Sequence, residues 1–277
     1  MDLKVREHAD TSIAVRFDDA DPAFVNSIRR TLLADVPKMA IEDVEFHLGP
    51  IRAEDGKEYE SVAPLFDEII AHRLGLVPIP TDLGMFVPKA TCPNCHGEGC
   101  PNCTIIFSLN KRGPGVVTSG DLEPIGDPKL KPRDGQIPIV KLGDGQALLI
   151  YATATLGTGR EHAKWQVAHG VGYRFVTVLK AGGKTFEASE AKVPPCPDHI
   201  LRPGTEEMTV ELRSDCRACR KFADAYDVKT VKVLNDPSKV ELQFETDGSL
   251  TARDTLIAAL DILEKRFADL GGKVEQL

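Results

Sequence analysis

The sequence lacks the features that mark several classes of protein. No apolar run approaches the ~20 residues needed to cross a bilayer; the longest lies near Ala147–Ala154. The start, MDLKVREHADTS, has no apolar core of a signal peptide, so we expect a cytoplasmic protein without a membrane partner. Acidic residues outnumber basic residues, and the net charge of −8 argues against a broad basic surface for direct, sequence-specific DNA binding.

Motifs of catalysis are also missing. The sequence contains no Walker loop, and Gly182-Gly183-Lys184 lacks the earlier glycine that such a loop requires. It contains no GxSxG nucleophile elbow. His72 and His162 have no paired base or nucleophile nearby in the sequence. We therefore predict no catalytic residue in this chain. Its 42% hydrophobic and 27% charged residues are those of an ordinary globular protein of one to three domains.

Four of the seven cysteines form one compact pattern in CPNCHGEGCPNC, namely Cys92, Cys95, Cys100 and Cys103. Each Cys-x2-Cys turn directs two thiolates at one ion, and two such turns supply the soft ligands of a closed tetrahedral zinc site. Gly97 and Gly99 allow the connector to turn. The alternative is a surface loop with idle thiols, but the spacing favours zinc. A zinc-dependent, chaperone-like binder is one function compatible with this pattern.

The other three cysteines are Cys196, which precedes Pro197, and the pair Cys216 and Cys219. A Cys-x2-Cys pair with a remote Cys-Pro is similar to ferredoxin ligation, but Phe222 occupies the slot of the next cysteine. Three interpretations stay open: a three-iron [3Fe-4S] cluster, an empty site, or a fourth ligand from His199, Asp215 or Asp224. An iron–sulfur electron carrier or redox-sensing module is the alternative function that this set suggests.

The rest of the pattern is that of an α+β scaffold. Alternation predicts a hairpin at the start, through Leu3 and Val5 and then Ile13 to Phe17, and a second hairpin turned by Asn235-Asp236-Pro237. A helix should begin at Pro22, capped by Asp21. A second should span 65–74, bury Phe66, Ile69, Ile70 and Leu74, and stop at Gly75. Residues 146–156 should form a buried strand, and residues 113–145 loops with short strands.

The last helix carries the strongest periodic signal. Thr251 should cap it, with Asp254 three residues later, and Gly271 should end it. Apolar residues recur at steps of four and three, a 3.5-residue seam suited to lengthwise packing on another helix: Leu256, Leu260, Leu263, Phe267 and Leu270. The seam lies either on the protein's own sheet or against a helix of another chain. A matching stripe in the first helix consists of Phe24, Ile28 and Leu32.

Four long strings, in order along most of the chain, resemble one protein family. FVNSIRRTLLADVPKMAIEDVEF is similar to the start of the α-type subunits of cellular RNA polymerases. DEIIAHRLGLVPIPTD, EHAKWQ and FETDGSLTARDTLIAALDILEKR resemble later segments of the archaeal branch. The sequence is thereby identified as a member of the α-like subunit family of DNA-directed RNA polymerases, in its archaeal branch.

The resemblance implies a particular architecture. Residues 1–41 and 229–277 would form a discontinuous dimerisation domain of two hairpins and two helices. Residues 42–181 would form an inserted, mainly β second domain that carries the zinc-type loop at 92–103. Residues 182–228 would form a small ferredoxin-like third domain. Phe222, in place of a cysteine that many members of the family have, puts a four-iron cluster in doubt and leaves the three-iron form.

The resemblance also implies partners and a role. The seam of the last helix and the stripe of the first would form a heterodimer interface with the small subunit L. The pair, with subunits N and P, would then form the platform on which the large catalytic subunits assemble for transcription. The chain would be part of a nucleotidyltransferase only as a subunit of that complex, because catalysis belongs to the large subunits.

Overall fold

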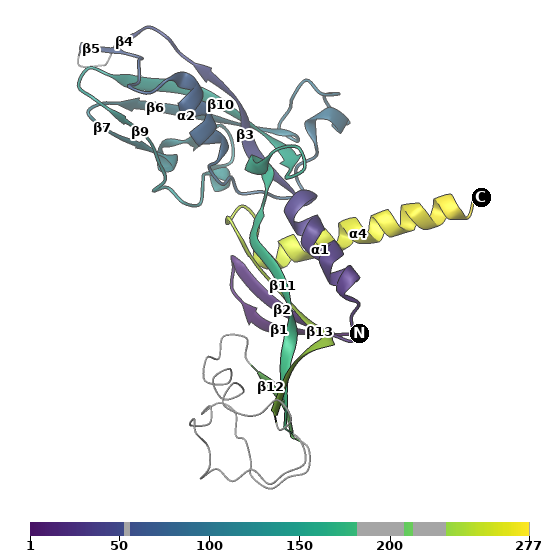
Figure 1. The fold of residues 1–277 in the computed structure, drawn as a ribbon. Coiled ribbons are helices and arrows are strands. Elements are labelled where there is room, and N and C mark those ends of the chain that lie inside the picture. The colour runs from purple at the N-terminus through teal and green to yellow at the C-terminus, as the bar shows by residue number, and fades with distance from the viewer. Residues whose placement is uncertain (53–55, 182–207, 213–230, 277) are drawn as a thin grey trace, which may run out of the picture. The chain divides into compact units, whose positions relative to one another are not determined.

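The computed structural model describes residues 1–52, 56–181, 208–212 and 231–276 (Figure 1). The chain divides into two compact units, each assembled from three separate stretches. The first unit comprises Met1–Glu7, Ala14–Arg29 and Gly172–Gln243, and the second comprises His8–Ile13, Arg30–Val171 and Phe244–Leu277. Segments far apart in the sequence therefore build each unit. No helix among the described residues is long and apolar enough to cross a membrane.

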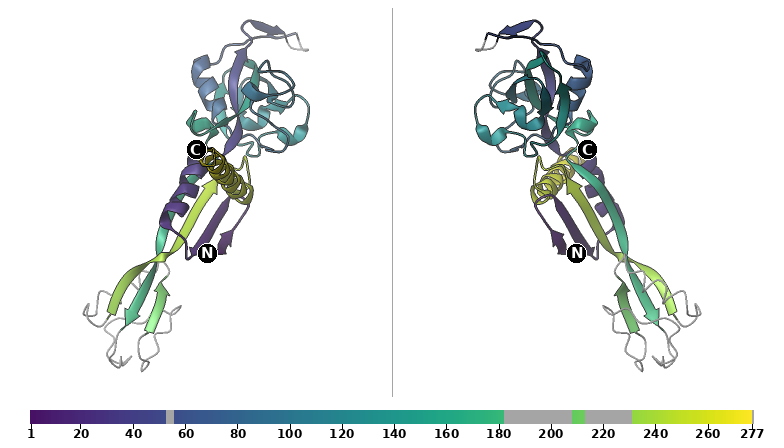
Figure 2. Two further views of the ribbon diagram at one scale, coloured as in Figure 1. Left: turned by 90° about the vertical axis from the view of Figure 1, so that its right-hand side faces the viewer. Right: turned by 90° about the vertical axis from the view of Figure 1, so that its left-hand side faces the viewer.

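A five-stranded sheet joins the two ends of the sequence. Its strand order is β1 (Asp2–His8), β2 (Ser12–Asp18), β13 (Val231–Thr246), β11 (Ala168–Ala181) and β12 (Met208–Leu212). β11 and β13 run side by side as long strands (Figure 2). The N-terminal hairpin is confirmed: the Ala9 N–H donates to the Ser12 carbonyl at 2.8 Å, and β2 buries Ile13, Val15 and Phe17.

The second predicted hairpin is wrong, because β13 continues without reversal through Asn235-Asp236-Pro237. The Asp236 carboxylate accepts hydrogen bonds from the N–H and the hydroxyl of Ser238, at 3.1 and 2.6 Å. The Asp19 N–H donates to the Ser238 carbonyl at 2.8 Å. The side chain of Asp236 thus forms a local bend of the Asx type inside a long strand. Turn residues satisfied in this way do not need to reverse the chain.

A four-stranded antiparallel sheet lies at the centre of the second unit. Its order is β3 (Pro37–Phe46), β10 (Ala147–Thr158), β6 (Thr104–Arg112) and β8 (Glu123–Pro124). Two further antiparallel pairs are β4 (Pro50–Arg52) with β5 (Glu58–Glu60), and β7 (Gly115–Thr118) with β9 (Pro138–Leu142). The expected buried strand at 146–156 and the short strands of 113–145 are confirmed. The sheet packs its apolar face into one core that includes Ile41, Phe107 and Ile150.

Helix α1 (Pro22–Ala34) begins where the sequence predicts, since Asp21 accepts a hydrogen bond from the Ala23 N–H at 2.8 Å. Helix α2 (Asp67–Gly75) also ends at the predicted glycine and buries Ile70 and Leu74. The predicted burial of Phe66 and Ile69 is wrong, because their exposed fractions are 75% and 40%. Only a narrow face of the helix is buried, and Phe66 is the N-cap residue, outside the helix itself.

Helix α4 (Ala252–Val274) is 23 residues long. The Thr251 side chain accepts from the Asp254 N–H at 3.1 Å and donates to the Asp254 carboxylate at 2.7 Å, so the predicted cap is confirmed. The predicted end at Gly271 is wrong. The helix continues through Gly271 and Gly272, neither of which has the positive φ of a C-terminal cap, and the Glu275 N–H still donates to the Gly271 carbonyl.

Candidate metal site and partner surface

The four cysteines of residues 92–103, the four-cysteine loop, come together around one point. Their sulfur atoms all lie within 4.8 Å of one another. The Sγ–Sγ distances are 3.7 Å for Cys92 and Cys100, 3.5 Å for Cys95 and Cys103, and 3.8 Å for Cys100 and Cys103. Cys92 and Cys103 are buried, whereas Cys95 and Cys100 are partly exposed. Four soft ligands at these distances could bind a metal.

Local backbone geometry explains why this stretch folds into a ligand cage. Each Cys-x2-Cys turn is closed by its own hydrogen bonds, from the His96 N–H to the Cys92 carbonyl and from the Cys103 N–H to the Cys100 carbonyl. Gly97 and Gly99 have φ values of 99° and 111°, as their predicted role in the connector requires. His96 also has a positive φ, of 50°, which the sequence did not indicate. Cys103 leads directly into β6, so the sheet anchors one side of the cage.

The thiols differ in how readily they ionise. Burial opposes ionisation of Cys95, but hydrogen bonds from the N–H groups of Gly99 and Gly97 and from neighbouring thiols lower its pKa to about 6. Burial raises the pKa of Cys103 to about 12. Metal ligation requires thiolates, so a bound cation would displace the protons that the sulfur atoms share. The site is thus a partly ionised cluster of sulfur ligands.

The second predicted cysteine set, Cys196, Cys216 and Cys219, lies outside the described residues. The same holds for the third-domain segment 182–228, apart from β12.

The residues of the predicted helical seam differ in exposure. In α4, Leu256 and Leu263 are buried within the chain and Leu260 is partly buried. In α1, Ile28 and Leu32 are fully buried and Phe24 is partly buried. Phe267 and Leu270, by contrast, are 60% and 57% exposed. The described part of the chain therefore covers the first half of the seam and leaves the second half free.

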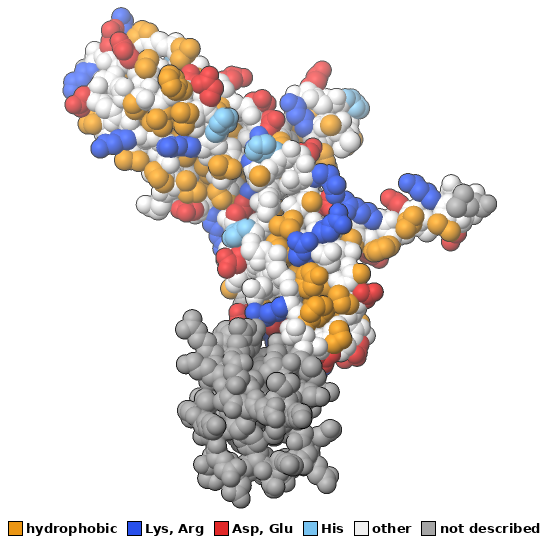
Figure 3. All heavy atoms as spheres, in the orientation of Figure 1, with side chains coloured by type: hydrophobic (Ala, Val, Ile, Leu, Met, Phe, Trp, Pro, Cys, Tyr) orange, Lys and Arg blue, Asp and Glu red, His pale blue; other side chains and the backbone are white. Residues whose placement is uncertain are grey.

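The free half is one residue longer than the sequence predicted. Because α4 does not end at Gly271, Val274 continues the seam and is 59% exposed. Phe267, Leu270 and Val274 are spaced by three and four residues, which places them on one face of the helix. We call these three residues the α4 stripe. Apolar side chains along the end of this helix are visible in Figure 3.

Sequence reasoning missed a cluster of charged residues around Asp35, just after α1. The Asp35 carboxylate accepts hydrogen bonds from Arg160 at 2.7 and 3.0 Å and from Arg266 at 2.7 Å. Its side chain is only 8% exposed. The partners are 125 and 231 residues away in the sequence, so no local pattern could reveal the cluster. An acidic residue at a helix C-terminus was the one available signal.

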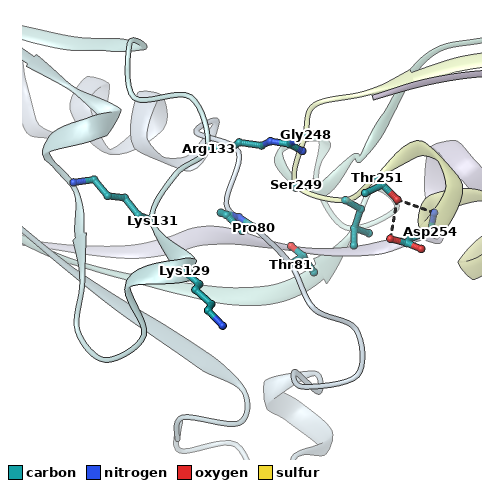
Figure 4. A pocket seen from close by; sticks show the side chains of 10 residues that line it. Pro80, Thr81, Lys129, Lys131, Arg133, Gly248, Ser249, Thr251 and Asp254 are labelled. Carbon is teal, nitrogen blue, oxygen red and sulfur yellow. Dashed lines mark hydrogen bonds between the residues drawn. The ribbon is translucent and has the colours of Figure 1, made fainter. Parts of the chain in front are cut away.

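A pocket of about 340 Å³ lies in the second unit beside the N-terminus of α4 (Figure 4). Its ionisable lining residues are Lys129, Lys131, Arg133 and Asp254. Lys131 and Arg133 pair with carboxylates, at 2.5 and 3.0 Å, and Asp254 is held by the helix cap. No histidine or cysteine lines this pocket, and the hydrogen bond between Thr251 and Asp254 in its lining belongs to the cap of α4.

Comparison of the sequence with known proteins matches this chain to one family. The model of the RNA polymerase Rpb3/RpoA insert domain matches residues 51–174. The chain is 45% identical to DNA-directed RNA polymerase subunit Rpo3 of Picrophilus torridus, over 97% of each chain. It is 43% identical to the Thermoplasma volcanium subunit Rpo3, over 98% of each, and 32% identical to that of Pyrococcus furiosus, over 96% of this chain and 94% of the relative. The chain therefore belongs to the Rpo3 family of DNA-directed RNA polymerase subunits.

Proposed function

We propose that this chain is a non-catalytic assembly subunit of an archaeal DNA-directed RNA polymerase. It heterodimerises with the small subunit L, and the pair nucleates assembly of subunits N and P and the large catalytic subunits. The observation that carries the proposal is end-to-end similarity to Rpo3 proteins of three archaea. The absence of a catalytic motif from the sequence agrees with it. Relatives that are polymerase subunits over their whole length do not favour the iron–sulfur carrier alternative.

The α4 stripe is the part of the proposed dimer interface that the described residues of the chain leave exposed. Burying a Phe, Leu or Val side chain contributes roughly 1.5–3 kcal/mol each. A partner helix with a matching 3.5-residue repeat would cover all three residues of the stripe at once. The buried members of the predicted interface then hold α1 and α4 within the fold, and α4 presents the stripe; these members are Ile28, Leu32, Leu256 and Leu263. Phe24 and Leu260, which are partly buried, would lie at its margin.

We further propose that the four-cysteine loop holds zinc. A tetrahedral ion with Zn–S bonds of about 2.3 Å separates its sulfur ligands by about 3.8 Å. Three of the sulfur–sulfur distances are 3.5–3.8 Å and all lie within 4.8 Å, which agrees with a single ion of this kind. An iron–sulfur cluster places its own iron and sulfide atoms between the thiolates, so it needs cysteine sulfur atoms that lie farther apart. The ion would tie β6 to the segment before Cys92 and stabilise a loop with little apolar area.

We also propose a second metal site and a division of the chain into three domains. Cys196, Cys216 and Cys219 would hold a [3Fe-4S] cluster in a ferredoxin-like third domain at 182–228. Residues 1–41 and 229–277 would form the dimerisation domain, and 42–181 the inserted domain. The insert-domain model matches residues 51–174, which lie within 42–181, and this supports an inserted domain in that part of the chain.

Co-purification tests the assembly role. The full chain, co-expressed with the subunit L from the same genome, should elute as a heterodimer and should recruit the large subunits. Phe267→Asp would place a carboxylate in the apolar contact, at a cost of several kcal/mol, and should weaken the heterodimer at least 100-fold. Because Phe267 is exposed in the chain alone, the variant should fold normally.

The matched control is Ala268→Asp, on the same turn of α4. Ala268 is also exposed, but it lies about 100° around the helix from Phe267 and off the stripe. It should leave the heterodimer intact. An intact heterodimer with Phe267→Asp, measured by analytical ultracentrifugation, would refute the interface. Failure of the unaltered chain to bind subunit L would refute the assembly role.

Metal analysis tests the two cysteine sites separately. An anaerobic preparation of the full chain should contain about one zinc and three irons, with sulfide and visible absorption. Cys95→Ser should remove the zinc and leave iron, whereas Cys216→Ser should do the reverse. Zinc alone would refute the cluster, and iron that is lost with Cys95→Ser would refute the assignment of zinc to the four-cysteine loop.

A further inference from the structure

The exposed half of α4 has few attachments to the other described residues. From Glu264 to Val274 every residue is exposed. Within the part of the chain that the structure describes, one side chain of this half forms an ion pair outside the helix. That side chain is Arg266, whose guanidinium donates to the Asp35 carboxylate at 2.7 Å. Arg266 therefore ties the segment that carries the α4 stripe to the body of the second unit.

Asp35 is an unfavourable residue for its position unless it has cationic partners. It follows the last turn of α1, where the carbonyl groups of the helix repel a negative charge, and that turn contains no basic residue. Its side chain is also largely withdrawn from water, which penalises the charged form. Two guanidinium groups offset both costs, one from the loop after β10 and one from α4. This placement indicates that Asp35 serves as an anchor for the two arginines.

Arg160 holds the anchor in place. Its backbone N–H donates to the Ala34 carbonyl at 2.8 Å and so caps the end of α1. The preceding Gly159 lies so close to α1 that an added Cβ would be 2.4 Å from the Leu33 carbonyl oxygen. The loop is therefore packed tightly against the end of the helix. Arg160 and Asp35 are thus held in place at the end of α1. Of the three charged residues only Arg266 lies on α4, so a movement of α4 would break its ion pair with Asp35.

We propose that Asp35 is a positioning residue for partner binding: with Arg160 and Arg266 it forms a bracket that fixes the direction of the exposed half of α4. This Asp35 bracket presents the α4 stripe to the partner in one orientation. The inference rests on the proposed function. The electrostatics of the ion pair agree with this role, since the hydrogen bond from Arg266 lowers the pKa of Asp35 and the same bond raises the pKa of Arg266. Both groups therefore stay charged throughout the physiological range.

Two variants of the full chain test the bracket, Asp35→Asn and Arg266→Gln. Hydrogen–deuterium exchange of the chain alone should become faster in residues 264–274 in both, and change little in the β3–β10–β6 sheet. If one tenth of the molecules then present the stripe correctly, the apparent Kd for subunit L rises about tenfold. The double variant should be no weaker than Asp35→Asn alone, because that substitution already removes the ion pair with Arg266. Asp35→Glu, which keeps the charge, should recover part of the affinity.

The matched control is Arg253→Gln, which removes a guanidinium from the same helix. Arg253 is exposed and pairs with Asp254 at 3.8 Å, away from the bracket. It should change neither the exchange of 264–274 nor the affinity. Unchanged exchange and unchanged affinity in Asp35→Asn would overturn the proposal, as would equal effects in the control. If the unaltered chain does not bind subunit L, the assembly role fails and the exchange measurement alone decides the bracket.

Discussion

Replacement of Gly157 by alanine should destabilise the second unit through a single contact. Gly157 lies in β10, and an added Cβ would be 2.5 Å from Cδ2 and Cε2 of Trp165 and 2.8 Å from its Nε1. Ordinary contacts of a Cβ atom begin near 3.4 Å, so the indole would have to move by about 1 Å. Trp165 is buried and its indole N–H donates to the Thr155 carbonyl at 3.1 Å. That hydrogen bond and the packing around the ring oppose the movement.

The size of the effect follows from these two terms. Overpacking of a buried site costs about 1–3 kcal/mol, and loss of a buried hydrogen bond about 1 kcal/mol more. Gly157→Ala should therefore lower the free energy of unfolding by about 2–4 kcal/mol. For a chain of this length, each kcal/mol lost from the free energy of unfolding lowers the melting temperature by about 2–4 °C. The melting temperature should fall by at least about 4 °C.

Urea unfolding followed by tryptophan fluorescence measures this directly, because Trp165 is the sole tryptophan of the chain. The emission spectrum of the folded variant should also change, since the indole environment is altered. Gly115→Ala is the matched control: an added Cβ there meets nothing within 4 Å. It should alter stability by no more than about 0.5 kcal/mol. A Gly157→Ala variant with an unchanged midpoint and unchanged emission would refute the packing argument.

Two further predictions concern pH and metal. The Arg266 hydrogen bond lowers the pKa of Asp35, so its stabilising contribution is complete above the unfolded pKa of ~3.9 and is lost as the pH falls through the folded pKa. Asp35→Asn should therefore be less stable than the unaltered chain at pH 5–8 in urea titrations, and a difference that does not shrink as the pH falls below ~3.9 would contradict this. Cys103→Ser should release the zinc and lower the melting temperature, as a strong chelator should for the unaltered chain; a melting curve that the chelator does not shift would exclude a structural ion.

Features whose physics is local were predictable from the sequence. The caps of α1 and α4 rest on Asp21 and Thr251, each of which bonds to an N–H group two or three residues away. The four-cysteine loop is equally local, because all its ligands lie within twelve residues and its turns close on themselves. Spacing alone therefore indicated that these sulfur atoms converge.

Features decided by tertiary context were not predictable. Asn235-Asp236-Pro237 has the composition of a turn, but pairing across β13 keeps the strand extended and the Asp236 side chain absorbs the bend. Gly271 has the composition of a helix end, but it remains helical within α4. The Asp35 bracket joins residues 231 positions apart, and only the folded chain brings them together.

The seam of α4 is continuous in the sequence, yet its surroundings change after Leu263. The exposed part, from Glu264 to Val274, is shorter than the ~12–15 residues at which an isolated helix becomes even marginally stable. It stays helical because it extends a helix whose first half is already fixed by burial. Its apolar side chains gain no burial within the described chain, and exposed apolar stripes favour association. The same 3.5-residue repeat therefore serves two packing partners: the chain itself up to Leu263, and beyond it, in our proposal, the helix of another subunit, with the Asp35 bracket at the junction.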